Sequence, residues 1–176
     1  MNRTTSVRPV WPVRRQWGVV MALLLLCPTC VADDRLEFQV QGAITPSCGL
    51  VADRVRIDLG TVAAGELGGV GSTSPWRRAV FTGRDCVGAT RASVTLRATP
   101  YAADPRYISP VGEARGVAIE MQAAGGQSLP PDDTTAVVFT WEGGQPELGF
   151  EARYVRVGAL QAGSAGATAQ VQIVWE

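Results

Sequence analysis

Few residues in this chain are of the types that most often do chemistry in proteins. The sequence has 176 residues, four cysteines and no histidine. Without histidine, the chain cannot form a Ser-His-Asp or Cys-His nucleophile pair, a histidine general base, or a zinc site with histidine ligands. We therefore predict that the protein is not an enzyme and that it uses no metal and no other cofactor.

The remaining polar clusters favour structural roles. Asp132 and Asp133 follow two prolines, a context typical of a solvated turn. Trp76 precedes Arg77 and Arg78, and an indole ring beside arginines can stack on a sugar. A single aromatic residue does not make a sugar site, so a place in the core or at its rim is favoured for Trp76. No paired carboxylates with general acid and base spacing stand out, and we assign no catalytic residue.

The first part of the chain has the pattern of an export signal. Residues 1–18 contain four arginines and no acid, residues 19–27 are an unbroken apolar run, and small residues follow up to position 32. Nine apolar residues are too few to span a bilayer but suit a signal-peptide core, so we expect residues 1–32 to be cleaved. The alternative is a buried N-terminal helix. Cys27 and Cys30 have the C-x-x-C spacing of redox motifs but lie in the part expected to be removed.

Dividing the chain after residue 32 changes its charge and its cysteine count. The whole chain is neutral, but the signal carries +4, and the rest, with twelve arginines and sixteen acids, carries −4. That balance offers no basic stripe, and we expect no nucleic-acid partner. The two cysteines left, Cys48 and Cys86, would enter an oxidising compartment, which favours a disulfide over two free buried thiols.

Alternation of apolar and polar residues recurs along the rest of the chain, and this period of two is typical of half-buried strands. Turn sequences rich in glycine, proline and aspartate separate these runs, and no stretch after residue 32 keeps a helical stripe. We predict one all-β domain, an antiparallel β-sandwich. A phase shift between Tyr154 and Val155 indicates a bulge or an edge. The clearest alternating runs are 55–59, 91–99, 117–121, 137–141 and 148–157.

The two longest runs of alternation lie near the ends of the chain. An apolar strand edge with nothing beside it is an aggregation hazard unless another strand covers it. A strand donated head-to-tail from one molecule to the next would generate a fibre, whereas a strand that pairs within its own sandwich would leave a monomer. The residues alone leave both readings open. The apolar faces are Leu36, Phe38, Val40, Gly42 and Ile44 in the first run, and Ala167, Ala169, Val171, Ile173 and Trp175, followed by Glu176, in the second.

Six segments occur in an order and at spacings that are specific when taken together. They are residues 38–48 (Phe-x-Val-x-Gly-x-Ile-x-x-x-Cys), 55–60, 81–86, 116–121, 148–154 and 163–176. With these segments the chain resembles a fimbrial subunit of the chaperone-usher pathway, of the type 1 pilus kind, over residues 36–176. The resemblance implies an incomplete immunoglobulin-like β-sandwich that lacks its last strand, preceded by the cleaved signal peptide.

The resemblance also implies domains and partners. Residues 33–45 would be a donor-strand extension containing the first apolar face, and residues 46–176 the pilin domain. A periplasmic pilus chaperone would pair with the C-terminal strand and anchor the carboxylate of Glu176. At an outer-membrane usher, the extension of another pilin subunit would replace the chaperone, giving a cell-surface fimbria that supports cell adhesion. The alternative is a self-complemented monomeric β-sandwich that binds a ligand in the periplasm or at the cell surface.

Two features depart from the family pattern. The last strand usually has a penultimate tyrosine and an earlier phenylalanine, where this chain has Trp175 and Val171. The interval from Gly42 to Cys48 is also about one residue shorter than the family pattern. The first difference bears on pairing with a chaperone, and the second on how far the donor segment reaches.

Overall fold

The computed structural model describes residues 37–176. The predicted signal peptide, with Cys27 and Cys30, and the first donor residue, Leu36, lie outside the described residues. Residues 42–176 form one compact unit. No helix among residues 37–176 is long and apolar enough to cross a membrane.

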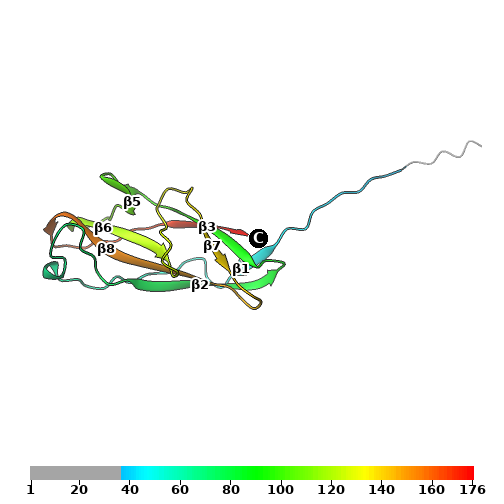
Figure 1. The fold of residues 1–176 in the computed structure, drawn as a ribbon, viewed down its shortest axis with the longest axis horizontal. Helices are drawn as coiled ribbons and strands as arrows, with labels where there is room; N and C mark the ends of the chain where they lie inside the picture. Colours follow the sequence, from blue (N-terminus) through cyan, green and yellow to red (C-terminus); the bar gives the residue numbers. More distant parts are fainter. Residues whose placement is uncertain (1–36) are drawn as a thin grey trace, which may run out of the picture. The chain divides into compact units, whose positions relative to one another are not determined.

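The compact unit is built from antiparallel strands, with one short turn of 3-10 helix at Ala64–Glu66 (Figure 1). A six-stranded sheet has the order β1-β2-β8-β6-β5-β4, and a three-stranded sheet has the order β7-β3-β9. The predicted antiparallel β-sandwich is confirmed. The strands are β1 (Ser47–Leu50), β2 (Arg77–Val87), β3 (Arg91–Arg97), β4 (Pro100–Tyr101), β5 (Asp104–Ile108), β6 (Arg115–Ala123), β7 (Val137–Thr140), β8 (Glu147–Gln161) and β9 (Gln170–Trp175).

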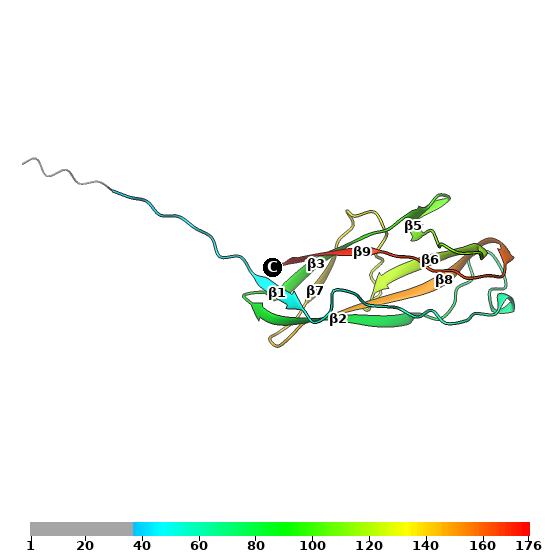
Figure 2. The same ribbon diagram turned by 180° about the vertical axis from the view of Figure 1, so that it is seen from behind.

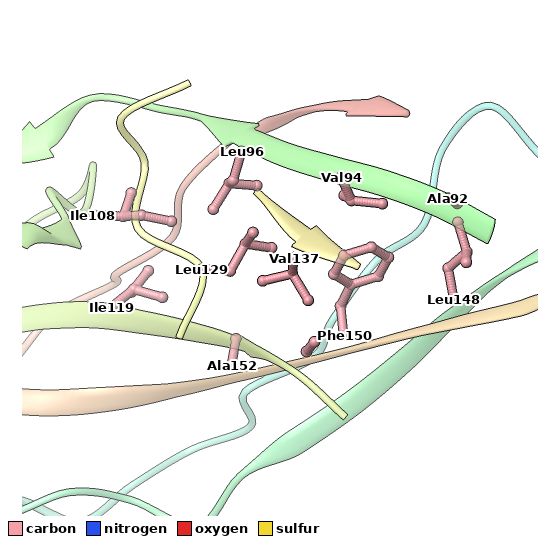
Figure 3. Close-up of a cluster of buried hydrophobic side chains, with 11 residues drawn as sticks. Ala92, Val94, Leu96, Ile108, Ile119, Leu129, Val137, Leu148, Phe150 and Ala152 are labelled. Carbon is pink, nitrogen blue, oxygen red and sulfur yellow. The ribbon is translucent and has the colours of Figure 1, made fainter. Parts of the chain in front are cut away.

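The core is made of the inward-facing residues of both sheets, as the alternation predicts. In β3, Ala92, Val94 and Leu96 are fully buried, while the intervening side chains are not. Across the core, Leu148 and Phe150 of β8 face these residues (Figure 3). Burying each large apolar side chain contributes roughly 1.5–3 kcal/mol, so this interleaving is the main stabilising term of the sandwich.

A disulfide joins the first strand to the second. Cys48 in β1 is bonded to Cys86 in β2 across 38 residues of sequence. The pairing of β1 with β2 runs from Ser47 opposite Val87 through an irregularity at the cysteines. The predicted disulfide is confirmed, and it holds the short β1, whose four residues alone would pair weakly.

The irregularity predicted in β8 lies further along the strand than expected. Tyr154 and Val155 pair in continuous register with β6, so there is no bulge between them. The register shifts beyond Arg156, where extra residues of β8 lie opposite Gly116. Gly116 has φ +76°, and a Cβ there would collide with a β8 carbonyl. The glycine in the facing strand therefore marks the bulge better than the change of apolar phase.

Candidate functional site

An open groove of about 1060 Å³ runs along one side of the sandwich. One wall is the chain segment 53–60, which follows β1, and the other is β9 with the residues just before it. Figure 2 shows both walls as long traces on the same side of the molecule, β9 in red and the segment after β1 in cyan to teal. The groove reaches between the two sheets down to the core.

The first wall has the side-chain pattern of a strand but not the pairing of one. Val55, Ile57 and Leu59 are half-buried, and Ile57 and Leu59 pack against the core, whereas the intervening side chains are exposed. The strand predicted at 55–59 is therefore correct in side-chain alternation but wrong in assignment. Just before this segment, the N–H of Val51 donates a hydrogen bond to the carbonyl of Thr82. In the described chain, residues 52–59 make no backbone–backbone hydrogen bond. Their peptide groups lack a neighbouring strand.

The second wall is an edge strand. β9 pairs with β3 alone, in an unbroken antiparallel register. At its end, the N–H of Glu176 donates to the carbonyl of Arg91 (2.8 Å), and the N–H of Arg91 donates back (2.9 Å). Backbone groups alternate in direction along an antiparallel strand, so Val171, Ile173 and Trp175 direct their N–H and C=O groups away from β3, toward the open side. Side chains of the same three residues are half-buried over the core.

The residues before β9 continue this wall without being a strand. β9 begins at Gln170, so Ala167 and Ala169 line the groove from outside the strand, and Ala167 is exposed. The Tyr154 hydroxyl donates a hydrogen bond to the carbonyl of Ala165 (2.8 Å) and holds this stretch near β8. Burial of the phenol, together with the charge of Asp58, raises the pKa of Tyr154. Small side chains here leave the groove wide.

Aromatic and aliphatic side chains form the floor. Phe81 of β2 stands edge-on to Phe150, with ring centroids 5.7 Å apart. Met121 of β6 is half-buried, packs against the core and also lines the groove. Sequence analysis placed Met121 and Phe150 in predicted strands and Phe81 in one of the family-like segments, but did not assign any of them to the site. For Met121 and Phe150 the signal was the inward phase of the predicted strand, and this phase does not distinguish a covered core residue from one that lies beneath a groove.

The end of β9 is fixed by aromatic and polar contacts. Trp175 packs edge-on against Trp141 with ring centroids 6.0 Å apart. The backbone oxygen of Glu176 accepts hydrogen bonds from the N–H groups of Thr90 (2.8 Å) and Arg91 (2.9 Å). Trp175 thus supplies the aromatic body at the position where the family pattern has tyrosine.

The donor residues that the structure describes are exposed. Phe38 is 86% exposed, Val40 93% and Ile44 100%. Residues 37–46 have no strand assignment. A Cβ added to Gly42 would meet no atom within 4 Å. The exposed apolar faces of this segment and the apolar groove of the compact unit have matching chemistry.

The other polar candidates are satisfied locally. Asp132 accepts hydrogen bonds from the Thr135 hydroxyl (2.6 Å) and from the N–H groups of Thr135 and Thr134 (2.7 and 2.9 Å), and these bonds lower its pKa to about 2. It closes a turn, as predicted. Residues 37–176 contain no group of three acidic, cysteine or histidine side chains arranged to hold a metal ion.

Trp76 is half-buried at the rim of the six-stranded sheet. The guanidinium of Arg153 lies 4.1 Å from the centre of its ring and is bonded to Glu120 at 2.7 Å. This partner comes from β8, far along the chain from the neighbouring arginines that the sequence pointed to. The contact uses one face of the indole for packing within the protein.

The arrangement defines a class of protein: a β-sandwich with one strand missing between two walls whose facing backbone edges have no partner strand. A family model described as fimbrial protein matches residues 36–175. Protein LpfE of Salmonella typhimurium is 31% identical over 135 residues, which cover 74% of this chain and 77% of that protein. The chain belongs to the fimbrial protein family and is a structural subunit of a surface pilus.

Solved structures agree with this fold. A chaperone-usher pilus structure that addresses rod uncoiling has a TM-score of 0.65 at 17% identity, covering 85% of this chain and 100% of that one. The CupB6 tip adhesin of Pseudomonas aeruginosa has a TM-score of 0.58 at 27% identity over 65% of this chain. This chain spans 35% of that adhesin's length.

Proposed function

We propose that the groove binds an extended strand supplied by another molecule, and that residues 33–45 supply such a strand to a neighbouring subunit. One observation carries this proposal: both walls keep apolar side chains toward the core while their backbone groups face a gap. A strand placed between Ile57 and Ile173 would pair with both walls, and its alternate side chains would enter the core. Subunits joined in this way would form a head-to-tail fibre.

The donor segment has the apolar groups that such binding needs. Phe38, Val40 and Ile44 are almost fully exposed, and burying each stabilises by roughly 1.5–3 kcal/mol. The three together would contribute about 4 to 9 kcal/mol, and Leu36 adds to this if it follows the same alternation. Backbone hydrogen bonds to the two free edges come in addition, and a subunit once inserted would leave slowly.

An open groove must also be covered before assembly, because an exposed strand edge invites aggregation. A periplasmic chaperone that lends a strand beside β9, with Glu176 as its anchoring point, fits this need. An outer-membrane usher would be the place of exchange, and the predicted signal at residues 1–32 would bring the chain into the periplasm. The fibre's role would be cell adhesion.

A deletion of residues 33–45 tests the proposal. We expect the shortened subunit to keep its β-sheet circular dichroism and thermal unfolding, because residues 37–45 are exposed in the free subunit. It should accept a synthetic peptide of residues 33–46 but should not polymerise in size-exclusion chromatography with light scattering. A self-complemented monomeric binding module would instead lose stability on deletion and would not polymerise at full length.

A further inference from the structure

We infer that Arg156 is a positioning residue for strand binding, because it ties down the chain that follows the first wall and so keeps the empty groove open. The chain concerned is the connection, residues 61–76, which links the first wall to β2. The inference rests on the proposed function and goes beyond it, since it concerns the subunit before any strand has entered.

The first wall is held mainly at its two ends. Residues 52–59 make no backbone–backbone hydrogen bond in the described chain, and of their side chains Ile57 and Leu59 pack against the core. A segment with so few contacts opens easily. At its beginning the wall is fixed through β1, which the Cys48–Cys86 disulfide joins to β2. Its other end needs an anchor as well.

Arg156 of β8 supplies this anchor with its side chain. One guanidinium nitrogen, Nη1, donates hydrogen bonds to the carbonyls of Leu67 (2.7 Å) and Gly68 (3.0 Å) in the connection. The Nε–H donates to the carbonyl of Gly158 (3.0 Å), which holds the guanidinium in place on its own strand. Leu67 is 4% exposed and is thus buried as well as hydrogen-bonded. Figure 2 shows the connection turning at the end of the sandwich away from the C-terminus.

The main chain of Arg156 bonds to the same connection. Its carbonyl accepts a hydrogen bond from the N–H of Gly71 (2.8 Å), and its N–H donates to the carbonyl of Ser72 (2.9 Å). Two residues earlier in β8, the Tyr154 hydroxyl donates to the carbonyl of Ala165 (2.8 Å), where the second wall begins. This stretch of β8 therefore fixes the chain beyond the first wall and the start of the second wall.

All three hydrogen bonds of the Arg156 side chain go to carbonyl oxygens. Within residues 37–176 no carboxylate lies at ion-pair distance from it. The planar guanidinium carries several N–H donors at fixed angles, so one side chain can reach both carbonyls of the connection and a third on its own strand. Hydrogen bonds from a charged donor are stronger than neutral ones, which suits a contact that must hold a wall without a partner strand.

An anchor of this kind acts on the empty groove more than on the filled one. When the connection is loose, the first wall leaves its open position for part of the time, and a strand can bind only the open fraction. An inserted strand would bond to the wall along its length and then hold it in place by itself. Loss of the anchor should therefore slow strand association and leave dissociation unchanged, whereas general damage to the groove would speed dissociation as well.

Stopped-flow measurements of strand insertion test this inference. The probe is a fluorescent synthetic peptide of residues 33–46, added to the full-length monomeric subunit. We expect Arg156→Met, which keeps an apolar stem but loses the donors, to slow association by about ten-fold and to change dissociation by less than about two-fold. Arg156→Lys, which can still donate to a carbonyl, should recover part of the association rate.

Cleavage by trypsin reports on the first wall itself. Arg54 and Arg56 are exposed on this wall, and a protease cuts there only after several residues of the chain have opened. Arg156→Met should speed cleavage after Arg56 in the absence of peptide, and Arg156→Lys should slow it again. Leu67→Ala loosens the connection without changing the arginine, and it should likewise slow association and speed this cleavage.

Arg115→Met is the matched control. Arg115 also donates two hydrogen bonds to carbonyls, those of Gly112 and Ala114 (both 2.8 Å), at the start of β6. These carbonyls belong neither to the two walls nor to the connection. The control variant removes the same charge and the same kind of bond, and it should leave association, dissociation and cleavage after Arg56 unchanged.

Two outcomes overturn different statements. If the wild-type subunit takes up the peptide but Arg156→Met and Leu67→Ala associate as fast as the wild type, or release the peptide faster, the positioning role is wrong while strand binding stands. If the wild-type subunit takes up no peptide, the proposed function itself fails.

Discussion

Replacing Phe38 with alanine separates the stability of the subunit from the stability of the fibre. The ring of Phe38 is 86% exposed in the subunit, so its removal takes almost nothing from the folded monomer. In the inserted donor strand the same ring would fill the groove above Phe81 and Phe150. The substitution should therefore leave the stability of the free subunit unchanged and weaken the binding of the donor strand in the fibre.

The expected loss of binding follows from the change in the exposure of the Phe38 ring between the free subunit and the inserted strand. Surface substitutions usually alter unfolding free energy by no more than about 0.5 kcal/mol, and we expect that for the free subunit. Burying a phenylalanine ring contributes roughly 1.5–3 kcal/mol, so a donor peptide with alanine at this position should bind about 10- to 150-fold more weakly. Most of that loss should lie in faster dissociation.

Two measurements check this prediction. Guanidinium unfolding of the monomer gives the subunit's stability, and peptide dissociation from the wild-type subunit gives the donor's contribution. Gln39→Ala, on the polar face of the same segment, is the matched control and should change neither. The reasoning is refuted if Phe38→Ala destabilises the monomer by more than 1 kcal/mol, or if the alanine peptide dissociates no faster than the wild-type peptide.

Three further changes have outcomes fixed by the structure. Replacing Cys48 and Cys86 together by serine should lower the unfolding free energy by about 4 kcal/mol, because the bond closes a long loop; an unchanged denaturation midpoint would contradict this. Gly42→Leu should leave monomer unfolding unchanged, since its Cβ meets open space, yet reduce fibre yield; normal fibres in electron micrographs would contradict a close approach at this glycine. Asp132 has its pKa lowered from 3.8 to about 2 by the Thr135 hydroxyl and nearby N–H groups, so its stabilisation is present above pH 4 and lost as pH falls toward 2. Solvent screening limits the effect to about 1 kcal/mol, and Asp132→Asn should flatten acid unfolding curves over that range.

Strands with one buried face could be predicted closely from the sequence. Alternation at 91–99 matches β3, and the runs at 117–121 and 137–141 lie in or overlap β6 and β7, because side chains of opposite polarity must face opposite sides of a pleated chain. The same rule predicted the inward phase of residues 55–59. It could not predict that this run has no backbone hydrogen bonds to a neighbouring strand, since such partners depend on which segment lies beside it in the fold.

Contacts between segments that are distant in the chain could not be predicted from the sequence, for a related reason. Arg153 stacks on Trp76 because β8 passes beside the start of β2, and no local pattern encodes that neighbour. The donor and the last strand, by contrast, were predicted as a pair because each shows an apolar face near an end of the chain. Their exchange between subunits stays a prediction.

The edge-on pair of Trp141 and Trp175 gives the open side of the sandwich an optical signal of its own. Trp175 is half-buried on the strand whose outer edge is free, so a strand laid along that edge would change the water around the indole. Indole emission depends on solvent exposure. If subunits join by the proposed strand insertion, tryptophan emission would therefore report the joining in real time without any added label.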